Sequence, residues 1–395
     1  MEPSFPACLA RLTLITVVLT ACNESSAAER GAMLGAPIAN LDDATLGRFL
    51  LGKAVFERIA TQEEGLGPLY NEVRCSGCHD VPVVGGAGFD VRVLKATRYA
   101  NGRCDLLERE GGDNIQQRAT ALLVERGITR ENVPASATGR SLMTAPPLFG
   151  LGLVEAVSAQ AIAARADPDD RNGDGVSGRV ATAVDGTVGR FGRKGDLATI
   201  EGFVDTALRF EMGLTTPRHP REEGINGGGL PDGADPMGEP EIEQHGVDVL
   251  SEFARDLAPP QSAPLSVAAR DSVQQGQRFF SDAGCSNCHV PEMRTARDAP
   301  GTLANVAARM YSDLLLHDLG PALADVCGSS ASPAEWLTAR LWGLRFRTRF
   351  MHDGRATDVT QAILSHGGEA TAARAAFSAL DERQRALLLR FLAAI

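Results

Sequence analysis

The sequence predicts an all-α protein built from two similar domains, the first of which carries long, loop-rich insertions. Apolar residues recur at helical spacing, as in VDVLSEFARDL, where Val247, Leu250, Phe253 and Leu257 lie about one turn apart. Few segments have the pattern of a strand, and the loops are rich in glycine. A chain of 395 residues, 44% of them hydrophobic, is long enough for two domains with their own cores.

A unit that occurs twice supports this organisation. GRFLLGKAVFERI precedes one cysteine motif and SVQQGQRFFSDAG precedes another. Both predicted helices contain Gly-x-x-x-Phe, as Gly52/Phe56 and as Gly276/Phe280. Internal repetition of one unit implies two similar domains.

Composition places the domain boundaries. Residues 225–241 are loop-forming, and APPQSAP at 258–264 has the composition of a linker. We therefore expect the first domain at residues 41–258 and the second at residues 266–395. The chain ends in LDERQRALLLRFLAAI, a helical pattern for which Asp381 is the expected N-cap.

The N-terminus has the layout of an export signal. An apolar run at 12–21, too short to span a bilayer, follows Arg11. Leu-Thr-Ala-Cys at its end resembles the lipobox of bacterial lipoproteins, so we expect a signal peptide at 1–21, a lipidated Cys22 and a flexible tether at 22–40. The protein would then lie on the periplasmic side of a bacterial membrane, most simply the outer one, held by its lipid alone. The alternative is an ordinary secretory signal and a free periplasmic protein.

The charge of the chain limits its partners. The formal net charge is −11 and the sequence pI is about 5.2. Nucleic-acid binding needs a basic surface, so we exclude that class of partner. An acidic surface suits a cationic partner, although solubility alone also accounts for it.

The repeated motif reads Cys-x-x-Cys-His. Its members are Cys75, Cys78 and His79 in the first copy and Cys285, Cys288 and His289 in the second. A thioredoxin-like dithiol expects a βαβ setting, and a zinc site needs further ligands that neither copy has at zinc spacing. Cysteines at i and i+3 of a helical turn can each bind one haem vinyl group, with the histidine under the iron. The sequence therefore predicts two covalently bound c-type haems with His79 and His289 as proximal ligands, in domains of the cytochrome c type.

Two cysteines remain outside the motifs and the signal. Cys104 and Cys327 form an even pair in a chain expected to enter an oxidising compartment. They are candidates for a disulfide that ties the two halves together, and the alternative is two buried free thiols.

The stretch DPDDRNGDGVSGR is a candidate Ca²⁺ loop. Asp170, Asn172, Asp174 and Gly175 match the first half of an oxygen-rich calcium loop. The closing bidentate glutamate is missing, because Ala181 occupies its position. The alternative is a surface turn.

Several motifs together resemble a known family. They are PPLFGLGLVEAV, DPDDRNGDGVSGR, GRFGRK, YSDLLLHDLG, WGLRFRTRFMHDGRA and QAILSHGGEA. From about Leu46 to Ile395 the chain resembles the bacterial di-haem oxidoreductases, relatives of the di-haem cytochrome c peroxidases. The resemblance implies two c-type haem domains with electron transfer between them. Arg193 stands where the family often has tryptophan, so coupling between the haems would use another group, with Trp336 and Trp342 as candidates.

His366 is the expected sixth ligand of the second haem. VTQAILSHGG is the pattern of a short helix that ends in glycine. The segment aligns without gaps with the peroxidase stretch that supplies a methionine ligand, and His366 takes that position. The alternative is a histidine that compensates a helix dipole. His317 and His352, each followed by aspartate, are rival candidates, and Arg347 and Arg349 are expected partners of haem propionates.

The first haem has no such candidate, because no histidine follows His79 until His219. Met143, near two prolines, is one possible ligand. The resemblance instead implies an open or displaceable position, at which peroxide cleavage needs a distal acid–base group. Glu155, an acid inside an apolar run, is the candidate, and its alternative is a solvated face of a helix.

These observations predict an exported oxidoreductase of peroxidase type. The first haem would reduce an oxidant, most simply H₂O₂, and the second would relay electrons from a small redox protein or a quinol-linked cytochrome. Two other classes stay open at this point: a pure electron-transfer cytochrome and an oxygenase that acts on an organic substrate.

Overall fold

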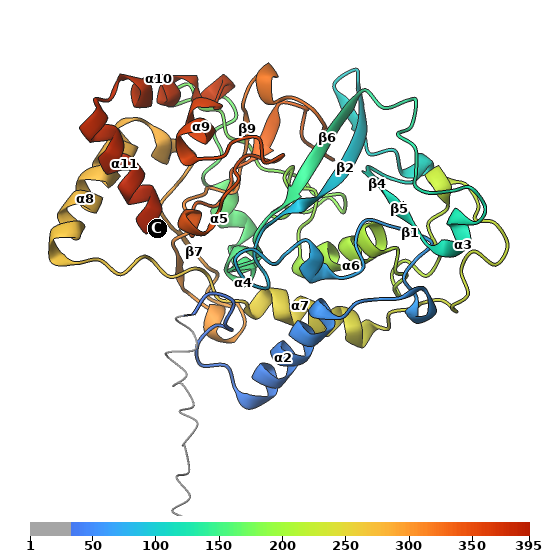
Figure 1. Cartoon of the computed structure of the whole chain (residues 1–395). Helices are drawn as coiled ribbons and strands as arrows, with labels where there is room; N and C mark the ends of the chain where they lie inside the picture. The colour runs from blue at the N-terminus through green and yellow to red at the C-terminus, as the bar shows by residue number, and fades with distance from the viewer. Residues whose placement is uncertain (1–32) are drawn as a thin grey trace, which may run out of the picture.

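The computed structural model describes residues 33–395 (Figure 1). The predicted signal peptide at 1–21 and the lipidated Cys22 lie outside the described residues. The described end of the predicted tether is attached to the fold, because the Ile38 amide donates to the Asp256 carbonyl at 2.7 Å and the Ala258 amide donates to the Ala36 carbonyl at 3.0 Å. Among residues 33–395, no helix has both the length and the apolarity needed to cross a bilayer.

The all-α prediction is wrong, because the structure is 35% helical and 14% strand. Strand β2 (Gly88–Ala100) pairs in antiparallel fashion with β6 (Gly139–Ala145), β3 (Arg103–Asp105) and β4 (Asn114–Ile115). This sheet lies in the insertion that the sequence predicted to be loops. Figure 1 shows β2 and β6 running side by side through the upper middle of the molecule.

Two helices that are far apart in sequence frame the first cysteine motif. They are α2 (Asp43–Glu57) and α7 (Gln244–Asp256), and Figure 1 shows them packed along the lower side. A Cβ at Gly52 would stand 2.0 Å from the Val249 carbonyl oxygen, so only glycine permits this close crossing. Phe56 packs at 4.9 Å, between ring centroids, on Phe253 of α7.

The second half repeats this arrangement with α8 (Val267–Asp282) and α11 (Glu382–Ala394). A Cβ at Gly276 would stand 2.0 Å from the Leu387 carbonyl oxygen, and the rings of Phe280 and Phe391 are 5.3 Å apart. The repeated Gly-x-x-x-Phe therefore has one explanation in both halves: glycine allows the helices to cross, and phenylalanine fills the crossing. Asp381 caps α11 with a capping box, as predicted.

The remaining elements are short. Helices α4 (Leu151–Glu155) and α6 (Ile200–Met212) pack near α7. The others are α3 (Ala121–Val124), α5 (Ala159–Ala163), α9 (Val359–Leu364) and α10 (Thr371–Ala379), with the strand pairs β1 (Leu69–Tyr70) and β5 (Arg118–Ala119), β7 (Met293–Arg294) and β8 (Ala307–Ala308), and β9 (Leu316–Asp318) and β10 (Glu335–Leu337).

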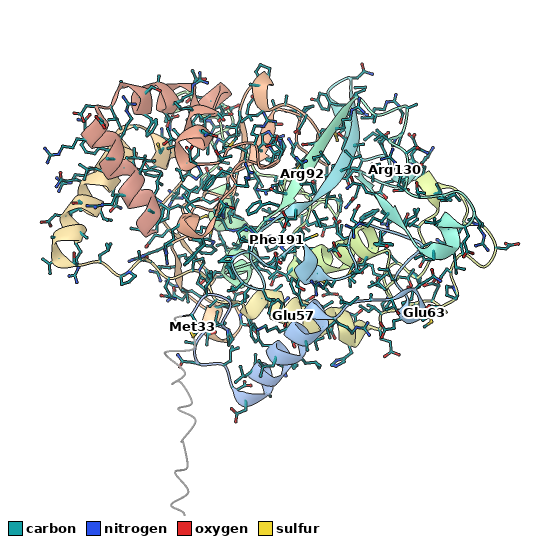
Figure 2. The ribbon with its side chains drawn as sticks, viewed as in Figure 1. Met33, Glu57, Glu63, Arg92, Arg130 and Phe191 are labelled. Carbon is teal, nitrogen blue, oxygen red and sulfur yellow. A yellow bond between two sulfur atoms is a disulfide. The ribbon has the colours of Figure 1, made fainter. Side chains whose placement is uncertain are left out.

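The largest hydrophobic cluster crosses the predicted domain boundary. It joins Phe49 and Phe253 of the first half to Met310, Leu314 and Trp342 of the second. Phe191, in the middle of the molecule in Figure 2, belongs to the same cluster. A second cluster, around the α8–α11 crossing, contains residues of the second half alone. A disulfide between Cys104 in β3 and Cys327, with the Cα atoms 5.8 Å apart, adds a covalent link between the halves.

Candidate haem sites

The first motif lies on a tight turn that follows α2. Residues Cys75–Gly77 form one 3-10 turn, and the His79 amide donates to the Cys75 carbonyl at 3.2 Å. Such a turn brings residues three apart to the same side, so Cys75 and Cys78 lie together. Burial raises the pKa of both thiols to about 12, so both are neutral at pH 7.

His79 is held in the tautomer that a metal ligand needs. Its Nδ1 lies 3.2 Å from the Gly86 carbonyl oxygen, and the ring of Phe56 lies 6.1 Å away. A carbonyl accepts a proton from Nδ1, which leaves the Nε2 lone pair free to bind iron. Burial lowers the pKa of His79, so the ring is the neutral imidazole.

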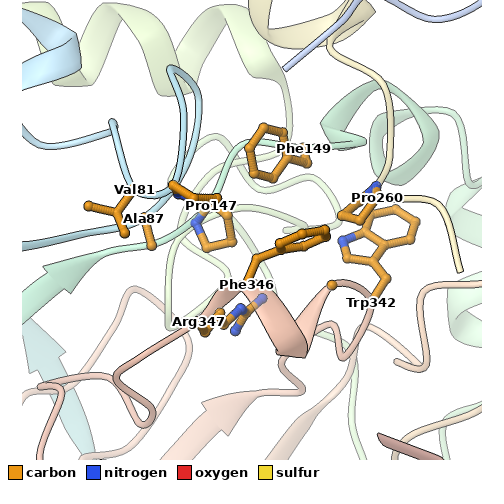
Figure 3. A pocket seen from close by; sticks show the side chains of 10 residues that line it. Val81, Ala87, Pro147, Phe149, Pro260, Trp342, Phe346 and Arg347 are labelled. Atoms are coloured by element: carbon orange, nitrogen blue, oxygen red, sulfur yellow. The ribbon is translucent and has the colours of Figure 1, made fainter. Parts of the chain in front are cut away.

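A small hollow, partly open to solvent, lies beside the loop that follows His79 (Figure 3). Val81 and Ala87 of that loop lie on one side in Figure 3, and Trp342 lies on the other. The guanidinium group of Arg347 is the one cation among the lining residues, which are otherwise apolar. An apolar lining with a single guanidinium fits a haem edge and its carboxylate. Trp342, one of the two predicted coupling residues, therefore stands between the halves beside the first motif.

The second motif has the same construction. Residues Cys285–Asn287 form a 3-10 turn, and burial raises the pKa of Cys285 to about 11. The Nδ1 of His289 lies 3.0 Å from the Tyr311 carbonyl oxygen, and the Phe280 ring lies 6.5 Å away. Burial, together with the charge of His366, lowers the pKa of His289 to about 4. This site also offers a neutral imidazole with a free Nε2.

His366 follows α9 and lies close enough to His289 for its charge to lower the pKa of His289. Its Nδ1 lies 2.8 Å from the Ala362 carbonyl oxygen, and burial lowers its pKa. His366 thus has the same tautomer and the same charge as the two motif histidines. The structure places a second neutral imidazole with a free Nε2 at the second site.

His317, a rival candidate, has no free ring nitrogen. Its Nδ1 lies 2.8 Å from Glu369 Oε2 and its Nε2 lies 2.9 Å from Asp313 Oδ2. Burial alone would lower its pKa, but hydrogen bonds to Asp313, Cys288 and Glu369 raise the pKa of His317 to about 12. His317 is therefore a buried imidazolium ion, 3.7 Å from the Cys288 sulfur, and is unsuited to bind iron.

His352 and Trp336 form a buried stack. The Nε2 of His352 lies 2.7 Å from Asp325 Oδ2, and its ring stacks on Trp336 at 4.0 Å. The Lys194 Nζ lies 3.4 Å from the Trp336 ring on a cation–π contact. Met143 packs in the same small cluster with Trp336, which places its side chain with this stack. This placement argues against Met143 as the ligand opposite His79.

A different methionine adjoins the first motif. The sulfur of Met212, at the end of α6, lies 3.9 Å from the Cys75 sulfur. No sequence pattern singles out Met212, because it belongs to an ordinary amphipathic helix.

Glu155 does not have the geometry of a distal acid–base group. Its Oε1 accepts the Ile200 amide at 2.7 Å at the start of α6, and its Oε2 accepts from Arg255 Nε at 2.8 Å. Both oxygens are already bound, so the side chain joins α4, α6 and α7. This geometry favours a structural role for Glu155 over the predicted catalytic one.

The candidate Ca²⁺ loop uses its oxygens internally and on the second motif. Asp170 accepts from the Gly175 amide at 3.1 Å, and Asp174 accepts from the Asn172 and Asn287 side-chain amides. Within residues 33–395, the one group of three or more acidic, histidine or cysteine side chains whose ligand atoms converge lies elsewhere, at Glu222, Asp235, Glu239 and Glu241. Asp170, Asn172 and Asp174 thus lie in a hydrogen-bonded turn that contacts the second motif through Asn287.

Two equivalent units, each with a neutral histidine, a free Nε2 and an apolar surround, define a protein built to hold two haems. A family model described as "Di-haem oxidoreductase, putative peroxidase" matches residues 137–395. The chain belongs to this family of di-haem oxidoreductases and is an enzyme of that class. A comparison with curated proteins found no match.

Three solved structures are similar in shape over most of the chain. Hydrazine synthase of Kuenenia stuttgartiensis is 12% identical, with a TM-score of 0.42 and coverage of 99% of this chain and 100% of that chain. A MauG-like protein associated with microbial copper homeostasis is 16% identical (TM-score 0.40, 91% and 92%). A variant of the diheme peroxidase BthA from Burkholderia thailandensis is 14% identical (TM-score 0.33, 90% and 87%). The family assignment rests on the family model.

Proposed function

We propose that the chain is an exported di-haem c-type cytochrome that reduces H₂O₂ at the first site with electrons relayed through the second. Cys75 and Cys78, and equally Cys285 and Cys288, would hold the haems by thioether bonds, with His79 and His289 as proximal ligands. A haem supplies one-electron redox chemistry and, at a free coordination position, binds small oxidants. H₂O₂ takes up two electrons and two protons to give two waters.

The observation that carries the proposal is the asymmetry of the two sites. All seven histidines lie in the described part of the chain. His219 bonds Asp205 at 2.7 Å, His245 is exposed, and His317 and His352 are bound to carboxylates. Outside the two motifs, His366 is the half-buried histidine that no carboxylate binds, and its charge acts on His289 of the second motif. A bis-histidine second site suits electron transfer, and a first site without such a partner suits an incoming oxidant.

The chain's own residues orient and cover the two proximal histidines. The Gly86 and Tyr311 carbonyls orient the proximal histidines and increase their basicity. Phe56 and Phe280 cover those rings and keep water from them. Trp342, beside the first site and in the core shared by both halves, is the residue best placed to assist coupling.

The decisive experiment combines spectroscopy with one substitution. In the purified holoprotein we expect one high-spin and one low-spin ferric signal by EPR, and His366→Ala should turn the low-spin signal high-spin. His245→Ala, at an exposed position, is the matched control and should change nothing. An unchanged spectrum in His366→Ala would refute the ligand. Two low-spin haems that stay low-spin after partial reduction, without peroxidase turnover, would instead identify an electron carrier.

We also propose that the electron donor is a small redox protein or a quinol-linked cytochrome, and that the enzyme is held at the periplasmic face by a lipid on Cys22. The net charge of −11 favours a cationic donor. Cys22→Ala should move the protein from the membrane fraction to the soluble periplasmic fraction. Equal membrane retention of the variant and the parent would contradict the anchor.

A further inference from the structure

Three arginines of the second half and the insertion, Arg193, Arg340 and Arg347, lie close together. Arg340 feels the charge of Arg193, and Arg347 feels the charges of both others. Asp353 is the one acidic charge that acts on Arg193. In residues 33–395, the Nε atom of each is buried and has no hydrogen-bond partner. None of the three belongs to an ion pair of the described residues. Like charges gathered in this way are unfavourable unless anions lie among them.

The cluster lies between the two haem sites. On one side, Arg193 Nη2 donates to the Thr144 carbonyl at 3.1 Å, two residues before Pro146, whose backbone approaches His79. Arg347 borders the hollow beside the His79 loop (Figure 3). On the other side, Leu341, next to Arg340, donates its amide to the Met310 carbonyl at 2.9 Å, one residue before the carbonyl that holds His289.

The guanidinium groups are fixed in position. Arg347 Nη2 donates to the Arg340 carbonyl at 3.2 Å, so these two side chains share one segment. Burial, with Arg193 as a neighbour, lowers the pKa of Arg340 to about 10, and burial with both neighbours lowers that of Arg347 to about 9. All three are still charged at pH 7. A planar guanidinium pairs with a carboxylate through two parallel hydrogen bonds, so three of them form a strong carboxylate-binding site.

We propose that Arg193, Arg340 and Arg347 form one shared site that binds propionate carboxylates of both haems. The inference rests on the proposed function to the extent that both haems are present. In this proposal Arg193 binds propionates of both haems and so links the two sites. The inference also separates Arg347 from Arg349, two residues away, which is exposed and lies outside the cluster.

The electrostatic consequence is measurable. A buried positive charge near a haem favours the reduced form, which carries one positive charge fewer than the oxidised form. Removal of one guanidinium leaves a carboxylate without its partner and should lower the reduction potential. For the shared residue Arg193, the potentials of both haems should fall.

The test is a spectroelectrochemical titration of the purified holoprotein, without peroxide. In Arg193→Gln we expect the ratio of ferrous to ferric haem at a fixed potential to fall about tenfold for both haems. This change corresponds to a reduction potential that is lower by about 59 mV for a one-electron couple. Arg347→Gln should lower the potential of the first haem more than that of the second. Arg130→Gln, at an exposed position, is the control and should leave both potentials unchanged.

Two further experiments test the shared carboxylate site. Arg193→Lys keeps the positive charge but loses the planar guanidinium group that pairs with a carboxylate through two hydrogen bonds. Its reduction potentials should therefore lie between those of the parent and of Arg193→Gln. Its haem content also shows whether a substitution at this position permits folding. Acetate titration of the parent protein tests whether the cluster takes an anion from solution instead. Unchanged potentials in Arg193→Gln and Arg347→Gln with full haem content, or saturable spectral changes with acetate that these variants abolish, would overturn the inference. Because no oxidant is present, a failed peroxidase assay would bear on the proposed function and not on this site.

Discussion

Gly52→Ala should weaken the crossing of α2 and α7 severely, although alanine is the better helix former. The added Cβ would stand 2.0 Å from the Val249 carbonyl oxygen, 2.8 Å from its carbon and 2.9 Å from the Phe253 Cβ. An ordinary contact between carbon and oxygen is about 3.3 Å, so the helices must separate by more than 1 Å. Backbone atoms cannot turn aside as a side-chain end can.

The expected loss in the free energy of unfolding is about 3 kcal/mol or more, because overpacking of a fixed crossing typically costs about 1–3 kcal/mol and the obstacle here is main chain. Gly47, in the same helix, has no atom within 4 Å of its added Cβ and is exposed. Gly47→Ala should therefore gain about 0.5–1 kcal/mol from helix propensity.

Urea unfolding of both variants, followed by circular dichroism and by the Soret band of the first haem, measures the difference. Phe56 lies one turn beyond Gly52 and covers His79, so the haem signal should broaden in Gly52→Ala alone. Equal stabilities of the two variants would refute the close crossing.

Two further predictions follow from the packing of the second half. Cys104→Ser with Cys327→Ser should lower the free energy of unfolding by about 2–5 kcal/mol, and the parent should show the same loss in reductant; a double variant as stable as the oxidised parent would count against the link. Because the pKa of His317 is raised to about 12 in the fold from its usual 6.5, its stabilising effect is complete below about pH 6.5 and is lost as the pH rises toward 12. The free energy of unfolding of the parent should thus fall between pH 7 and pH 10, by at most about 1.4 kcal/mol per pH unit, and His317→Asn should flatten that slope. An equal slope in both proteins would contradict the buried imidazolium.

The sequence predicted the features that depend on local spacing. The two motifs, the Gly-x-x-x-Phe helices before them and the Asp381 cap of α11 all depend on neighbours within one or two turns. Each of these features has, in the structure, the position along the chain that the sequence pattern predicted.

The features that the sequence missed depend on distant partners. Strand β2 finds its partner β6 about forty residues later. Its charged residues Arg92, Lys95 and Arg98 are spaced three apart and so fall on both faces, which hides the alternation of a half-buried strand. Glu155 looked unpartnered because Arg255, which binds it, is 100 residues away.

Buried arginines are equally hard to predict. Arg193 and Arg340 have the sequence environment of surface residues, since nothing local indicates burial of a charge. Only the tertiary structure brings them beside Arg347. The contact of His317 with Glu369, 52 residues away, was missed for the same reason.

The loop at 167–179 has a consequence for how the chain can be divided. It comes before the second motif in sequence, yet Asp174 accepts from Asn287 inside that motif at 3.1 Å, and Ser177 donates to Glu369, which in turn holds His317. A gene fragment that encodes 266–395 alone would lack these contacts and would expose Met310 and Leu314 to water. The two halves are therefore one folding unit, so a cut between them should yield two incomplete pieces rather than two small cytochromes.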